Sequence, residues 1–116
     1  MILSALCLAA NLYFEARGEP IDGQILVAEV TINRGEDICK TVFKKGQFSW
    51  TNDKNLAIDD PQAFLAAYTL AYELLEDGCI LCSDATFYHN KTVKPYWAKH
   101  MVLLGSYGNH VFYRKG

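Results

Sequence analysis

The first part of the chain carries apolar residues at helical spacing. Ser4 suits the N-cap of a helix that runs to about Arg17, and Gly18 is a typical helix stop. Because the apolar residues recur every three or four positions, they fall on one stripe of that helix. The stripe consists of Leu3, Leu6, Cys7, Ala10 and Phe14. The pattern therefore predicts an amphipathic first helix.

A second helix is predicted from Pro20 to Arg34. Residues 24–33 alternate apolar and polar side chains, so this segment by itself fits a strand as well as a helix. Pro20 suits the first turn of a helix, where its missing N–H costs nothing. This start and the length of the segment favour a largely buried helix.

A third long helix is predicted after a polar stretch. Asp59 or Asp60 with Pro61 opens it, and Gly78 ends it. Residues 41–45 are expected to form only a short helical turn. The apolar stripe of the long helix consists of Phe64, Ala67, Tyr68, Ala71, Leu74 and Leu75.

The composition changes from residue 85 onward. Residues 86–89, 101–104 and 111–113 are typical of short strands, and residues 105–109 supply turn chemistry between the last two. Helices followed by strands predict an α+β fold. The length of 116 residues suits one domain, so we expect residues 1–116 to form a single catalytic domain.

The composition of the chain argues against several classes of function. The net charge of −2 argues against a nucleic-acid partner, since nucleic-acid binders concentrate Lys and Arg. No apolar run reaches the roughly 20 residues of a transmembrane helix. Residues 1–10 are apolar, but no Lys or Arg precedes them and the pattern continues into the next segment. We therefore read them as part of the mature domain and expect no export signal in this chain.

Four cysteines are present, and two of them have metal-site spacing. Cys79 and Cys82 resemble half of a zinc site or a redox dithiol, but Cys7 and Cys39 are isolated and offer no second close pair. We therefore expect buried or free thiols with at most one disulfide, no metal and no cofactor.

The segment from Tyr13 to Pro20 holds the densest candidate chemistry. Glu15 lies among apolar and aromatic residues at the end of the first helix, so it should lose hydration and its pKa should rise. A carboxyl group that stays protonated near neutral pH is a general acid for a glycosidic oxygen. Glu19 is expected at the N-terminus of the second helix, with a mainly capping role and as a secondary acid candidate. The alternative is two surface acids with Arg17 as their ion-pair partner.

Six motifs in order resemble the SleB-type cell wall hydrolases, the family of spore-cortex-lytic enzymes and several phage endolysins. The resemblance spans nearly the whole chain, and each motif alone is weak. The opening YFEARGEP is followed by short matches at residues 23–24, 27–28 and 33–34. The others are TV at 41–42, QFSW at 47–50, ATFYH at 85–89, PYWA at 95–98 and GNHVFY at 108–113.

The resemblance implies a compact lysozyme-like fold that cleaves peptidoglycan between N-acetylmuramic acid and N-acetylglucosamine. It places the catalytic glutamate on Glu15 and favours a lytic transglycosylase, which forms 1,6-anhydro-muramyl ends with one carboxyl group. Ordinary hydrolysis uses two carboxyl groups. Asp53 and Asp84 are the remaining candidates for a second one. Phe43 stands where the family often has a cysteine, so no disulfide is carried over.

The same resemblance suggests a substrate groove. Gln47, Ser49 and Trp50 are expected to line it, although Trp50 fits a core position equally well. Tyr88 and His89 alternate along a strand, so only one of them should face the groove. Trp97 and His110 complete the predicted substrate-binding set.

These features are typical of a phage endolysin without a separate wall-binding domain. We expect a monomer, made in the host cytoplasm, that acts on the wall in the periplasm or outside. The alternatives are a hydrolytic muramidase at the same bond, a non-catalytic peptidoglycan-binding module, and a small zinc protein.

Overall fold

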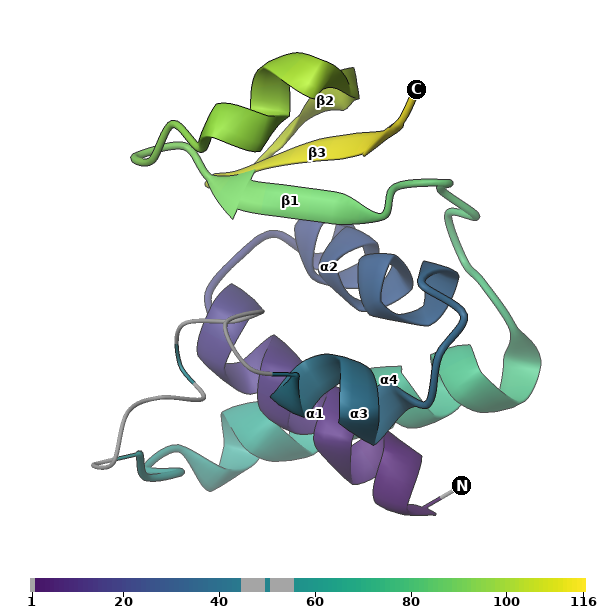
Figure 1. Ribbon diagram of the computed structural model, residues 1–116. Coiled ribbons are helices and arrows are strands. Elements are labelled where there is room, and N and C mark those ends of the chain that lie inside the picture. Colours follow the sequence, from purple (N-terminus) through teal and green to yellow (C-terminus); the bar gives the residue numbers. More distant parts are fainter. Residues whose placement is uncertain (1, 45–49, 51–55) are drawn as a thin grey trace.

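The computed structural model describes residues 2–44, 50 and 56–116. Helices occupy the first two thirds of the chain and a small antiparallel sheet occupies the rest, which confirms the α+β prediction (Figure 1). The elements are α1 (Ile2–Ala16), α2 (Ile21–Asn33), α3 (Ile38–Phe43), α4 (Pro61–Asp77), β1 (Phe87–Asn90), the 3₁₀ helix η2 (Tyr96–His100), β2 (Met101–Tyr107) and β3 (His110–Lys115).

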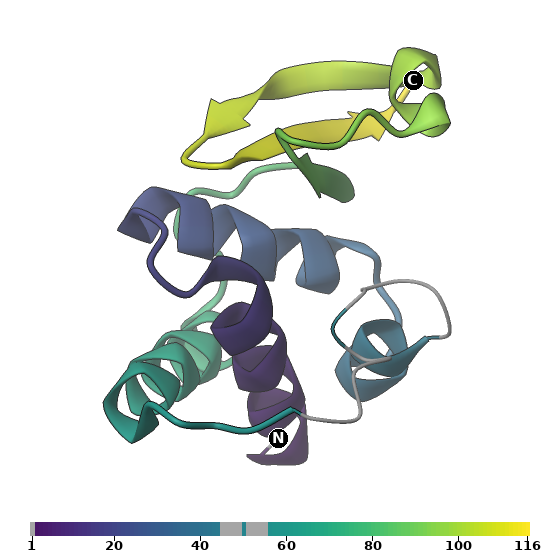
Figure 2. The same ribbon diagram turned by 90° about the vertical axis from the view of Figure 1, so that its left-hand side faces the viewer.

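The molecule has a layered arrangement. The sheet forms one layer, α2 lies directly against it, and α1 and α4 lie on the far side of α2 (Figures 1 and 2). One cluster of buried apolar residues connects the layers, from Leu8 and Leu12 of α1 through Val27 and Val30 of α2 to Phe112 of β3. In the described parts of the chain, the helices lack the length and apolar character that a membrane span requires.

The first helix forms as predicted, but its buried face differs from the predicted stripe. Leu3 is 69% exposed and Leu6 is 42% exposed, whereas Ala5, Leu8 and Ala9 are buried. The difference arises from tertiary packing. Helix α1 contacts α4, α2 and α3, so these three neighbours bury a wider part of its surface than one stripe. Small side chains on that arc allow the neighbouring helices to approach closely.

The ends of the other helices follow local signals. Pro20 is the N-cap of α2, and the helix interpretation of residues 24–33 is confirmed. Asp60 caps α4 by accepting a hydrogen bond from the Ala63 N–H, and Gly78 ends that helix. The predicted turn at 41–45 lies too late, because Asp37 caps α3 through the Lys40 N–H.

The sheet has the order β1-β3-β2 with antiparallel pairing throughout. Tyr88 of β1 pairs with Phe112 of β3, and the register shifts between Leu103 and Gly105 of β2. Strand β2 continues to Tyr107, so the turn is shorter than the predicted residues 105–109. The sequence pattern did not indicate η2. The strand β1 lies at an edge of the sheet, beside α2.

Two disulfides correct the expectation of mostly free thiols. Cys7 and Cys39 join α1 to α3, and Cys79 and Cys82 close a short loop after α4. The second disulfide joins the sulfur atoms of the same two cysteines, Cys79 and Cys82, that gave the zinc-site spacing. Periodicity could not reveal the first pair, because it depends on how α3 packs against α1.

A buried carboxylate holds the loop after α4 against α2. Glu29 is 1% exposed, and its two oxygens accept hydrogen bonds from four successive backbone N–H groups at residues 80–83. A buried charge needs such compensation because it has lost its hydration. The Cys79–Cys82 disulfide lies in this same loop. Glu29 thus fixes the chain just before it enters β1.

Candidate active site

Glu15 lies in the last turn of α1, where the helix approaches β1. Burial raises the pKa of Glu15 to about 7, and a hydrogen bond with the side chain of Tyr88 opposes that rise. The predicted direction of the shift is confirmed. A carboxyl group with this pKa is about half protonated at neutral pH and is able to donate its proton there.

Tyr88 is the partner that the sheet supplies to Glu15. Burial is the largest cause that raises the pKa of Tyr88 well above its ordinary value, and the charge of Glu15 adds to it. Tyr88 therefore stays protonated, and its interaction with Glu15 favours the charged form of that carboxyl group. Because side chains alternate along β1, His89 points to the opposite face, which agrees with the expectation that only one of the pair faces the site.

Asn11 extends this arrangement along α1. It precedes Glu15 by four residues and so lies on the same face of the helix. Its side chain is fully buried, lowers the pKa of Tyr88, and accepts a hydrogen bond of 2.9 Å from the indole N–H of Trp50. Asn11 was not among the predicted site residues, although a single amide within an otherwise apolar helical stretch was a usable signal.

Trp50 forms an aromatic cluster with Phe14 and Phe43. Its ring stacks on Phe14 with the centroids 4.9 Å apart, and Phe43 meets it edge-on. The indole N–H already bonds Asn11, so it is not free to bind a sugar. Trp50 is half-buried and packs on the core, as one of the two roles weighed for it requires, and Asn11 links it to Tyr88.

Arg17 does not pair with either glutamate of the motif. Its guanidinium lies 3.1 Å from the carboxylate of Asp59 and over the ring of Tyr13. The Tyr13 hydroxyl also donates to Asp59 and accepts from Arg17. The alternative of two surface acids with Arg17 as their ion-pair partner is therefore not realised.

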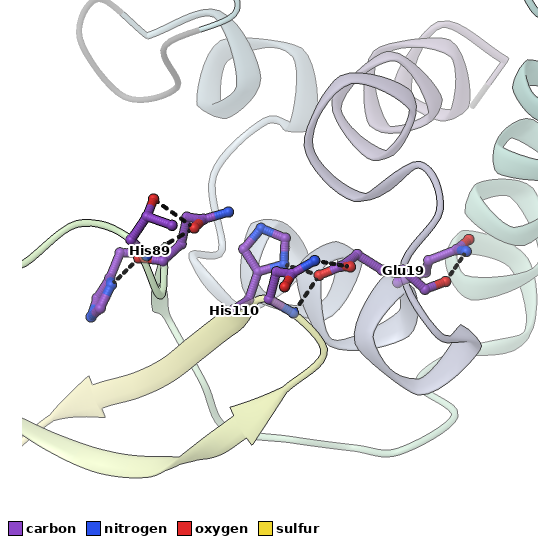
Figure 3. Close-up of polar contacts among 7 residues, drawn as sticks. Glu19, His89 and His110 are labelled. Atoms are coloured by element: carbon purple, nitrogen blue, oxygen red, sulfur yellow. Dashed lines mark hydrogen bonds and ion pairs between the residues drawn. The ribbon is translucent and has the colours of Figure 1, made fainter.

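Glu19 binds the turn between β2 and β3 instead of capping α2 (Figure 3). Its carboxylate accepts hydrogen bonds from the backbone and side-chain N–H groups of Asn109 and lies 3.1 Å from Nδ1 of His110. The capping interpretation is wrong, because α2 has no side-chain cap. Gly108 has a positive φ of 57°, and a Cβ there would lie 2.9 Å from the Glu19 carboxylate.

His110 is an interior residue. It is 3% exposed, burial is the main cause that lowers its pKa, and its ring meets Tyr88 edge-on at 5.1 Å. This placement removes His110 from the surface available to a glycan. It acts behind Tyr88 and ties the sheet to Glu19.

A second aromatic cluster lies on the other face of the sheet. His89 stacks on Tyr113, and Trp97 of η2 meets both rings edge-on. Both ring nitrogens of His89 have partners, namely the Tyr113 hydroxyl at 2.9 Å and the Asn90 carbonyl at 2.8 Å. His89 and Trp97 are therefore separated from Glu15 by the strand itself.

The structure thus brings Tyr88 to Glu15 and links Trp50 to Tyr88 through Asn11, and it places His110 behind Tyr88. His89 and Trp97 lie in the separate cluster with Tyr113. Gln47 and Ser49 lie outside the described residues, as does Asp53. Asp84 is exposed and lies 3.3 Å from Arg114. A partly protonated carboxyl group beside a tyrosine is able to act as a general acid.

The chain belongs to the cell wall hydrolase family, whose model matches residues 18–113. The fold is similar to the crystal structure of the catalytic domain of the Bacillus cereus SleB protein, with a TM-score of 0.71 and 23% sequence identity. That similarity covers 97% of this chain and 91% of that chain. No curated protein sequence matches this chain. The predicted resemblance to SleB-type hydrolases is confirmed, and family membership supports lytic activity on peptidoglycan.

Proposed function

We propose that this protein cleaves the glycosidic bond between N-acetylmuramic acid and N-acetylglucosamine in peptidoglycan, with Glu15 as its catalytic acid. The observation that carries the proposal is the raised pKa of about 7 at Glu15. The family match begins after Glu15, so the role of this residue rests on its geometry and its burial.

The chemistry proposed is that of a lytic transglycosylase. Glu15 protonates the leaving glycosidic oxygen, and the resulting carboxylate then removes the proton of the muramyl 6-hydroxyl. That oxygen closes on the anomeric carbon and gives a 1,6-anhydro end, so no water is consumed. Tyr88 holds the carboxyl group in place and stabilises its charged form between the two proton transfers.

The surroundings of the other acids support a mechanism with one carboxyl group. Hydrolysis with inversion or retention needs a second carboxylate about 5–10 Å from the first. Glu19 is bound to Asn109 and His110, and Asp84 lies beside Arg114 at an exposed position. The two candidates among the described residues, Glu19 and Asp84, are therefore engaged in structural contacts, and Asp53 lies outside those residues.

Product analysis tests the proposal. Purified sacculi are digested with the wild type, with Glu15→Gln and with the exposed control Glu73→Gln, and the fragments are examined by mass spectrometry. Anhydro-muramyl ends from the wild type and the control, but not from Glu15→Gln, are expected. Reducing ends would indicate a hydrolytic muramidase, and wall binding without cleavage would indicate a non-catalytic module.

We further propose that residues 1–116 act as one catalytic unit and that the protein serves as a phage endolysin. The single core that joins the helices to the sheet supports the first point. The two disulfides support action outside the cytoplasm, where disulfides persist. Co-expression with a membrane-permeabilising holin tests the second point, because an endolysin lyses the cell only when the membrane is opened.

A further inference from the structure

A pocket of about 470 Å³ lies outside the Glu15 site, where the end of α2, the end of α3 and two strands meet. The strands contribute the beginning of β1 and the end of β3, which pair through Phe87 and Tyr113 (Figure 1). The ring of Phe87 forms part of the lining. The proposed mechanism does not use this pocket.

The lining is cationic although the chain as a whole is acidic. Arg34, Lys44, Arg114 and Lys115 line the pocket, whereas its acids are Glu36 and Asp84. Asp84 already lies 3.3 Å from Arg114. With a net charge of −2 over the whole protein, an excess of positive charge in one concave place creates a local field that favours anions.

The guanidinium of Arg34 is fixed in orientation. Its Nε donates to the Thr86 carbonyl at 2.9 Å, and its plane lies over the Phe87 ring at 4.9 Å. The ammonium group of Lys115 lies 5.8 Å from the centre of the same ring. The pocket therefore offers the cationic groups of Arg34 and Lys115 around the apolar ring of Phe87. This combination suits a ligand that has both carboxylates and apolar groups.

The pocket is next to the proposed catalytic centre. Phe87 in the lining precedes Tyr88, whose side chain bonds Glu15. Arg34 also interacts electrostatically with Tyr88. Because Phe87 and Tyr88 point to opposite faces of β1, the link between the pocket and the Glu15 site is Arg34, whose charge acts on Tyr88.

We propose that the pocket binds the free carboxylates of the peptide stem carried by a muramyl residue close to the cleaved bond. This inference rests on the proposed function, because it assigns a further part of the same substrate. The glycan backbone is uncharged once its lactyl groups are amidated, whereas the stem peptides carry free carboxylates and apolar side chains. The stem is thus the part of the substrate whose charge and surface match the pocket.

The test compares two substrates. One is sacculi with free stem carboxylates, and the other is the same sacculi after a carbodiimide and ammonia have converted those carboxylates to uncharged amides. The variant is Lys44→Glu/Lys115→Glu, and the control is Lys91→Glu/Lys99→Glu, which places the same charge change on exposed lysines outside the pocket. Thermal unfolding of both variants shows whether they remain folded.

The expected result is that the KM for untreated sacculi rises about tenfold in the pocket variant, equivalent to about 1.4 kcal/mol. The KM for amidated sacculi should change less than about twofold. The control should behave as the wild type on both substrates. An equal change on both substrates, or no change on either, overturns the inference.

Two further arms keep the interpretation distinct. If the wild type cleaves neither substrate, the proposed function is wrong. If the wild type cleaves both substrates and the KM of the pocket variant changes equally on both, only the stem-binding proposal is wrong. Sacculi treated with hydrofluoric acid lack phosphodiester-linked wall polymers. If the defect of the pocket variant disappears on such sacculi, the pocket binds polymer phosphates and the stem proposal is wrong.

Discussion

The side chain of Tyr88 on β1 interacts with the carboxyl group of Glu15 on α1 and lowers the pKa of that carboxyl group. Through this contact the sheet supplies, among the described residues, the polar partner that counteracts the desolvation of the candidate acid. Asn11 holds Tyr88 from the helical side, and His110 packs against its ring. The state of Glu15 therefore depends on how the sheet docks on the helices.

The pH dependence of lysis should follow the protonation of Glu15. Because burial raises its pKa to about 7, the protonated fraction falls about tenfold for each pH unit well above that value. We expect kcat/KM for sacculus lysis to decline with that slope above about pH 7. Turbidity assays at constant ionic strength measure it. A profile that stays flat to about pH 9 would contradict a role for Glu15 as acid.

Tyr88→Phe should change both the rate and the pH profile. The hydrogen bond from Tyr88 lowers the pKa of Glu15, so its loss should move the alkaline decline to higher pH. Losing the bond that holds the carboxyl group should also lower kcat about tenfold, equivalent to about 1.4 kcal/mol. Tyr72→Phe on α4 is the matched control. A lower rate with an unmoved profile would mean that Tyr88 acts only in packing.

Glu15→Gln should stabilise the protein at alkaline pH. The folded-state pKa of about 7 lies above the ordinary 4.5, so this carboxyl contributes stability that is full below 4.5 and is lost as the pH rises through about 7. The glutamine has no such loss. The variant should match the wild type at about pH 4 and exceed it by about 1–3 kcal/mol at about pH 8.5.

Denaturant unfolding at the two pH values measures this difference, with the exposed Glu73→Gln as control. The control should keep the pH dependence of the wild type. Equal stability of Glu15→Gln and the wild type at alkaline pH would show that the Glu15 carboxyl is not desolvated.

Glu29→Gln should destabilise the fold. The amide keeps one accepting oxygen and turns a donating NH₂ group toward backbone N–H groups that need an acceptor. The expected loss is about 2–4 kcal/mol in the free energy of unfolding. Calorimetry measures it, and Glu73→Gln again serves as the control. A loss below about 0.5 kcal/mol would show that the loop does not depend on this carboxylate.

Much of the helical framework followed from local chemistry that the sequence displays. Gly18 and Gly78 adopt positive φ at helix ends, and Asp60 with Pro61 satisfies the first turn of α4. Such signals act within a few residues, so they could be predicted without knowledge of the fold. The apolar setting of Glu15 and the direction of its pKa shift belong to the same class.

Tertiary structure decided which partners these residues meet. The buried face of α1, the pairing of Cys7 with Cys39, and the contact of Glu19 with the β2–β3 turn all join segments far apart along the chain. The sequence by itself determined where the helices end and which carboxyl group lies among apolar residues. The docking of the sheet alone decided that Tyr88 meets Glu15, because local preferences set the bounds of each element while packing sets its neighbours.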